Sequence, residues 1–110
     1  MKKYCLIMKW DYEYDKEGTW FDNDSGIERY ELTQGATLAL PHISRKKLEI
    51  LSVTQEGGAV KAQLYVDYQT VTVSSEEEPV VAHVSDSYSA GGDSVHQSLC
   101  LTLSIEIKEE

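Results

Sequence analysis

The side chains most suited to chemistry are the oxygen ligands of a short polar segment, residues 22–28. Alternating oxygen ligands around a glycine turn can wrap a hard cation, which makes Asp22, Asp24 and Glu28 candidate calcium ligands. The match is incomplete, because a full loop of this kind has glycine at its sixth position and glutamate at its twelfth. Asn, Asp, Ser and Gly are also ordinary turn residues, so a plain turn is the alternative. No other cofactor is predicted.

The histidines and cysteines do not form a metal-binding pattern. His42, His83 and His96 lie at no ligand spacing, and Cys5 and Cys100 are far from them in sequence. We therefore expect each histidine on the surface or in a loop. Two thiols at opposite ends of an intracellular chain are expected to be reduced.

Catalytic groups are equally hard to assemble from this sequence. Nucleophilic catalysis needs a serine or cysteine held by a base near oxyanion donors. Serines and His96 occur together in residues 85–98, but no helix is expected that could form a nucleophile elbow. Paired carboxylates for glycoside hydrolysis need a larger cleft than a small domain usually forms. A protein without catalytic activity is predicted.

An aromatic stripe is the first candidate binding feature. The rings of Trp10, Tyr12 and Tyr14 alternate along one face, and Trp20 follows shortly after. They could close one end of the core, with hydroxyls reaching water or main chain. They could instead form a platform on which a sugar ring stacks while neighbouring acids and amides bind its hydroxyls. The same rings would also suit a protein-interface hot spot.

A second candidate is the polar segment 85–97, which is expected to be a long loop. Its tyrosine, serines and glycines are typical of binding loops, so Asp86, Tyr88 and Asp93 are candidate contacts. The segment lacks the Lys-Ser/Thr ending of a phosphate loop, and its acids would repel phosphate.

The elements expected to position these groups are strands. Valine, threonine, isoleucine, leucine and tyrosine dominate the patterned segments. Residues 4–14 and 99–108 each alternate between an apolar and a polar face. If these two strands pair near the middle of a sheet, Cys5 and Cys100 become neighbours on its outer face.

The clearest hairpin is predicted at Gly57-Gly58, because a two-residue turn with positive φ suits glycine. Folding about this turn pairs Val53 with Ala62 and Leu51 with Leu64. All four apolar side chains then share one face, so the turn and the alternation agree on the register.

Shorter strands are expected over residues 19–22, 27–32, 37–40, 69–74 and 80–84, with a turn at 33–36. Eight or nine strands without helices predict an all-β fold in one domain, a two-sheet antiparallel β-sandwich of jelly-roll-like or Ig-like type. The expected core is Leu6, Met8, Trp10, Leu51, Val53, Ala62, Leu64, Val66, Val71, Val73, Leu99, Leu101, Leu103 and Ile105.

The charge balance limits the class of partner. The chain has 110 residues, with 19 acids against 10 Lys and Arg, a net charge of −9. Such a field disfavours nucleic acid and anionic membrane surfaces. No apolar run approaches a membrane span, and the run at 4–8 is too short for a signal peptide. A cytoplasmic location is expected.

These features predict a small, acidic, intracellular protein-interaction module, of the kind that phages and mobile elements encode, or a homo-oligomer building block. Exposed sheet edges would permit strand addition. The basic triplet 45–47 could contact the glutamates at 76–78 of another copy. The runner-up is a carbohydrate or small-ligand binding module that uses the aromatic platform. A small hydrolase is the third choice.

Overall fold

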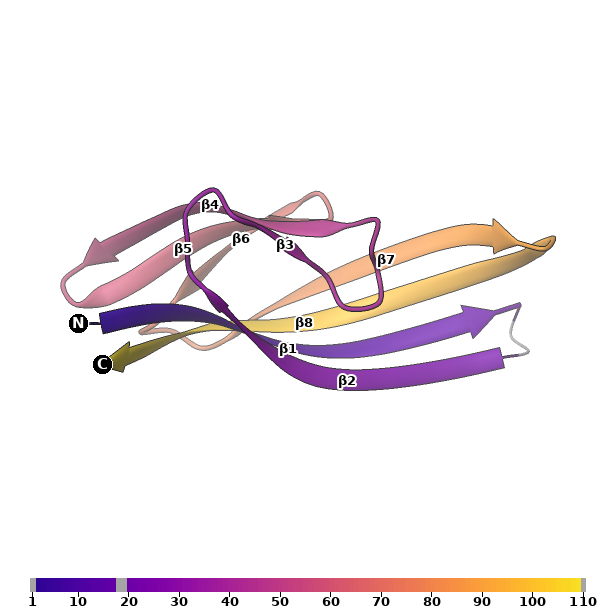
Figure 1. Ribbon diagram of the computed structural model, residues 1–110, viewed down its shortest axis with the longest axis horizontal. Coiled ribbons are helices and arrows are strands. Elements are labelled where there is room, and N and C mark those ends of the chain that lie inside the picture. Colours follow the sequence, from indigo (N-terminus) through magenta and orange to yellow (C-terminus); the bar gives the residue numbers. More distant parts are fainter. Residues whose placement is uncertain (1, 18–19, 110) are drawn as a thin grey trace.

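The computed structural model describes residues 2–17 and 20–109, and gives the side chain of every residue in these ranges except Trp20. The protein is all β, with eight strands in two four-stranded antiparallel sheets, which confirms the predicted sandwich (Figure 1). The long sheet has the order β2 (Trp20–Glu31), β1 (Lys2–Lys16), β8 (Asp93–Glu109) and β7 (Val80–Ala90). The short sheet has the order β3 (Thr37–Ala39), β4 (Lys47–Glu56), β5 (Ala59–Val66) and β6 (Gln69–Ser74).

The core lies between the inner faces of the two sheets. Alternation along β1 and β8 directs one set of side chains inward, as the sequence pattern predicts. Burial of apolar side chains is the main favourable term for such a fold. The fully buried side chains include Leu6, Met8, Ile43, Leu48, Ile50, Leu64, Leu99, Leu101 and Leu103.

One predicted core residue is wrong. The hairpin at Gly57-Gly58 pairs Val53 with Ala62 as expected, but the register shifts between Ile50 and Ser52. This bulge inserts Leu51 as an extra residue, so Ile50 rather than Leu51 faces Leu64. The side chain of Leu51 is 42% exposed, while Ile50 is fully buried.

The polar segment 22–28 is not a calcium loop or a turn. The expected strands at 19–22 and 27–32 belong to one strand, β2, which pairs with β1 without interruption and ends at Glu31, one residue earlier than expected. Thr19 lies outside the described residues. Gly26 serves packing here, because a Cβ at this position would come within 2.6 Å of the Trp10 ring. An extended strand spreads its side chains along its length, so it cannot wrap them around an ion.

The segment 85–97 is not a long loop. It forms a hairpin in which the end of β7 pairs with the start of β8 around Gly91 and Gly92, both at positive φ. The expected strand at 80–84 is therefore six residues longer, as β7.

Strands β1 and β8 lie side by side at the centre of the long sheet, as predicted. The two cysteines are not neighbours, however. Cys5 lies opposite Glu106 and Cys100 lies opposite Asp11, six residues further along β1, which is about 20 Å at the rise of a strand. Both thiols are free.

The molecule is elongated, measuring 54 × 21 × 20 Å. Figure 1 shows why: the long sheet runs well past the short sheet at the end that carries the β1–β2 and β7–β8 connections. We call this projecting part the arm, and define it as residues 13–16, 20–23, 85–90 and 93–98. No helix long and apolar enough to cross a membrane occurs in the described part of the chain.

Candidate binding surface

The loop between β3 and β4 closes the aromatic end of the core. Its His42 ring stacks on Tyr12 with a 4.2 Å centroid separation and meets Trp10 edge-on at 5.3 Å. Nε2 of His42 lies 2.9 Å from the Asp24 carboxylate of β2. Trp10 and Tyr12 are consequently only 7% and 6% exposed, so these two rings are part of the core.

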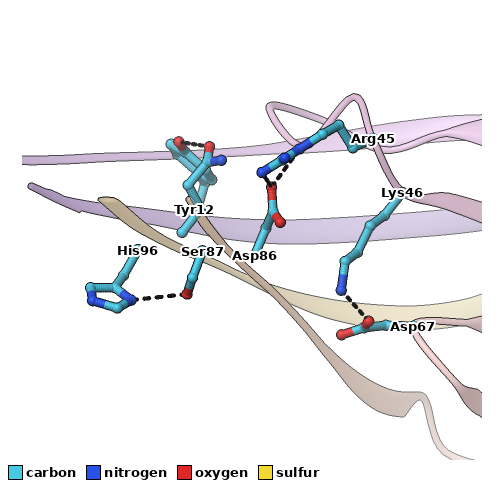
Figure 2. Close-up of polar contacts among 8 residues, drawn as sticks. Tyr12, Arg45, Lys46, Asp67, Asp86, Ser87 and His96 are labelled. Atoms are coloured by element: carbon cyan, nitrogen blue, oxygen red, sulfur yellow. Dashed lines mark hydrogen bonds and ion pairs between the residues drawn. The ribbon is translucent and has the colours of Figure 1, made fainter. Parts of the chain in front are cut away.

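The same loop holds the inner face of β7. The Arg45 guanidinium donates to Oδ2 of Asp86, with an Nη2–Oδ2 distance of 2.6 Å (Figure 2). It also lies over the Tyr88 ring, 5.0 Å from the ring centroid. Lys46 forms an ion pair with Asp67. Two members of the basic triplet are thus bound within the molecule, and a contact with the glutamates at 76–78 of another copy would compete with these pairs.

Three tyrosines from the two predicted binding segments meet on the inner face of the long sheet. Burial raises the pKa of Tyr12, and the neighbouring Tyr88 and Tyr14 hydroxyls raise it further. Burial and Tyr88 likewise raise the pKa of Tyr14. The Tyr12 hydroxyl also donates to Oε1 of Gln97 at 2.5 Å (Figure 2). The stripe and the β7–β8 hairpin therefore join in one cluster.

The other predicted contacts lie apart from this cluster. Asp93 is at the tip of the β7–β8 hairpin, where its carboxylate is 3.8 Å from Nζ of Lys16. The main chain of Trp20 pairs with Lys16 at the tip of the arm, and its side chain lies outside the described residues.

The outer face of the arm carries a trough of about 530 Å³ that crosses all four strands. Two cross-strand rows of side chains form its floor, because residues paired across antiparallel strands point to the same face. The first row is Asn23, Glu13, Ser98 and Ser85, and the second row is Phe21, Asp15, His96 and Ser87. Three further lining residues, Tyr14, Asp22 and Gln97, belong to the inner face.

The trough combines carboxylates, amides, hydroxyls, an imidazole and the exposed Phe21 ring. Among the described residues that line it, none is Lys or Arg. The Phe21 ring at its rim is 69% exposed. The floor can therefore accept hydrogen bonds at many points, and it attracts positive charge.

Ser87 and His96 are the one nucleophile–base pair that this floor brings together. Oγ of Ser87 lies 2.9 Å from Nδ1 of His96 (Figure 2). The N–H groups of a sheet lie in its plane, at right angles to the side chains, so none points into the trough as an oxyanion donor would. The pair lies on an open surface, and Asp15 lies across from His96 in the same row of side chains.

The candidate metal ligands do not converge. Within residues 2–17 and 20–109, no three His, Cys, Asp or Glu side chains are grouped as a metal site would require. Asp24, one of the three calcium candidates, instead binds His42 and the Ser25 amide. A hydrogen bond from His42 and another from the Ser25 amide lower the pKa of Asp24.

The sequence pointed to Glu13 and Asn23 only as polar neighbours of the aromatic stripe, and it gave no sign that His96 and Ser98 join them in one trough. The polar side of the β1 and β8 alternation could have placed Glu13, His96 and Ser98 on one face. Comparison of the chain with protein-family models, curated proteins and solved structures finds no match.

Proposed function

We propose that this protein is a non-catalytic interaction module that binds a positively charged segment of another protein at its arm. The trough on the outer face of the arm is the observation that carries the proposal. It is concave, it is rich in oxygen acceptors, and its lining includes Glu13 and Asp15 but, among the described residues, no cation other than a histidine.

The charges of the arm support a cationic partner. Two of its acids, Asp86 and Asp93, face Arg45 and Lys16 of the chain itself. Glu13 and Asp15 both line the trough. The net charge of −9 adds a long-range field that speeds the approach of a basic segment and weakens with salt.

Phe21 supplies an anchor for such a segment. Aromatic side chains dominate interface hot spots, and a ring face also attracts a Lys or Arg head group. Because the Phe21 ring is exposed beside the carboxylate row, one bound side chain could contact both.

A peptide array tests the proposal directly. Purified protein is applied to peptides of about twelve residues, the length of a strand that could follow β2, whose charge runs from strongly negative to strongly positive. We expect retention to rise with positive charge and to fall as salt is added. Retention that is independent of peptide charge would contradict the proposal.

Point variants locate the site. Phe21→Ala and Glu13→Lys should each weaken binding of the best peptide by about tenfold, the effect of losing one hot-spot contact. Glu56→Lys is the matched control, because it makes the same charge change at the far β4–β5 turn. Equal weakening by Glu13→Lys and Glu56→Lys would show that net charge, and not the arm, governs binding.

A saccharide is the second candidate ligand. The trough contains the hydroxyls of Ser85, Ser87 and Ser98 on one side and the exposed Phe21 ring on the other, which suits a polyol with one apolar face. Titrating the protein with a glycan panel while following tryptophan fluorescence distinguishes the two. A saturable shift with a sugar, without charge preference on the peptide array, would replace the peptide proposal.

A further inference from the structure

We infer that the basic segment binds as an added fifth strand along the free edge of β2, next to the trough. This inference rests on the proposed function and adds the mode of binding. Strand addition uses main-chain hydrogen bonds for affinity and alternate side chains for specificity. The edge of β2, its charge and its exposed side chains each point to this mode.

The edge of β2 is long and open. In the described sheet, β2 has a neighbour on one side only, β1, over the whole of Trp20–Glu31. The Leu32 amide donates to the Tyr4 carbonyl, which shows that the even-numbered residues here face β1. In an antiparallel pair, alternate residues direct their N–H and C=O groups away from the partner. The odd residues from 21 to 31 therefore present a row of donors and acceptors.

The other edges are shorter or covered. β3 has three residues and β6 has six. On β7, the Ser85 amide donates to Oδ2 of Asp67 at 3.1 Å, and Nε2 of Gln69 donates to the His83 carbonyl at 2.8 Å. These two contacts close the central part of the β7 edge. The twelve-residue β2 edge is the longest that remains.

The charge of β2 selects a basic occupant over a second copy of this chain. The strand contains Asp22, Asp24, Glu28 and Glu31 against Arg29, which gives a net charge of −3. Pairing two copies of β2 would set like charges across from one another, which destabilises a sheet. A strand with Lys or Arg at alternate positions would instead meet Asp22, Asp24 and Glu28 on the inner face.

The outer face of β2 offers apolar contacts at matching spacing. Phe21 and Ile27 lie six residues apart on this face and are 69% and 52% exposed. Side chains on adjacent strands are close enough to pack directly. Apolar side chains of the added strand on this face would therefore cover both.

One side-chain contact occupies part of the β2 edge in the free protein. Oδ1 of Asp24 accepts from the Ser25 amide at 2.9 Å, so it occupies one of the outward donors. A cationic side chain that binds the Asp24 carboxylate would compete for this oxygen. The Asp24–Ser25 hydrogen bond and the acidic side chains of β2 fit an edge that resists pairing with a second copy but accepts a basic strand.

Alternate N-methylation of the peptide tests the inference without changing the protein. The best-binding peptide of the array is made with N-methyl groups on its odd residues, or on its even residues. An added strand donates to β2 through one set only, so methylating that set should weaken binding by about tenfold or more. Methylating the other set should leave binding close to that of the parent peptide. Equal effects of the two sets would overturn the inference while leaving the proposed function in place.

A pair of protein variants provides the second measurement. Ile27→Pro removes one outward N–H group, which β1 does not use, and proline is tolerated on an edge strand. Ile27→Ala removes the apolar side chain but keeps the N–H group. We expect Ile27→Pro to weaken peptide binding more than Ile27→Ala, with circular dichroism confirming that both variants fold. Equal binding by both would count against main-chain pairing, and if Ile27→Pro fails to fold, the N-methylated peptides give the answer. If no array peptide binds at all, the proposed function itself fails.

Discussion

Gly26 is the residue on which the packing of Trp10 depends. It sits directly across from Trp10 in the β1–β2 pair, and its missing side chain makes room for the indole ring. Trp10 in turn contacts His42, which closes the aromatic end of the core. A glycine in a strand interior commonly marks such a close approach.

Replacing Gly26 with alanine should therefore destabilise the protein. The new Cβ would lie 2.6 Å from Cζ2 of Trp10, so the indole must move. Overpacking of this kind costs about 1–3 kcal/mol of the free energy of unfolding. Urea denaturation followed by tryptophan fluorescence measures the change. Ser25→Ala is the control, and an unchanged midpoint in Gly26→Ala would show that Trp10 is loosely held.

Asp24 should make the stability depend on pH. Its pKa is lowered in the folded protein by the hydrogen bonds from His42 and the Ser25 amide. A depressed folded pKa stabilises the protein above the unfolded value, about 4, and this contribution is lost as the pH falls through the folded pKa. Asp24→Asn should thus lose less stability than wild type on acidification below about pH 4. Urea titrations over a pH series, with Glu78→Gln as the control, check this. Parallel curves for wild type and Asp24→Asn would contradict it.

Among the elements, β4 carries the feature that the sequence pattern could not reveal. Simple alternation from the Gly57-Gly58 turn leads to Leu51 in the core, but the bulge moves Ile50 there instead. A bulge adds one residue to one strand, so every side chain beyond it changes face.

The bulge predicts that two adjacent substitutions differ greatly in their effect on the free energy of unfolding. Ile50→Ala removes a fully buried side chain and should cost about 2–5 kcal/mol. Leu51→Ala alters an exposed side chain and should stay within about 0.5 kcal/mol of wild type. Chemical denaturation of both variants measures the difference. A larger loss for Leu51→Ala would favour the uninterrupted register.

The limits of prediction differ between the core strands and the arm. The fold class, the pairing of β1 with β8 and the hairpin at Gly57-Gly58 could be predicted, because one buried face leaves an apolar alternation. The middle of β2 and the end of β7 could not, since their Asn, Asp, Ser and Gly content is typical of turns. The trough was missed as well, because Glu13 was expected beside the aromatic stripe and His96 in a separate loop, and only the pairing of the four strands brings them together.

At the scale of the whole molecule, the protein has a packed half and a projecting half. The short sheet covers the inner face of the long sheet at one end only, so the arm relies on its own ladder and on the loop that carries His42 and Arg45 (Figure 1). A sheet without a second layer buries less apolar surface and opens more readily.

Hydrogen exchange should therefore divide the long sheet into two regions. Amides of the arm, such as that of His96, should exchange with solvent at least about tenfold faster than main-chain amides near Leu103, where the two sheets pack together. Exchange resolved by nuclear magnetic resonance measures this. Uniform protection along β8 would show that the arm is as stable as the sandwich.

The binding affinity of a basic peptide as a function of salt tests the central claim most directly. The labelled peptide selected on the array is titrated with wild type, Glu13→Lys and the control Glu56→Lys. We predict that the dissociation constant of wild type rises steadily with salt, and that Glu13→Lys weakens binding about tenfold more than Glu56→Lys. Affinity that is unaffected by salt, or equally affected by the two charge reversals, would contradict binding at the arm.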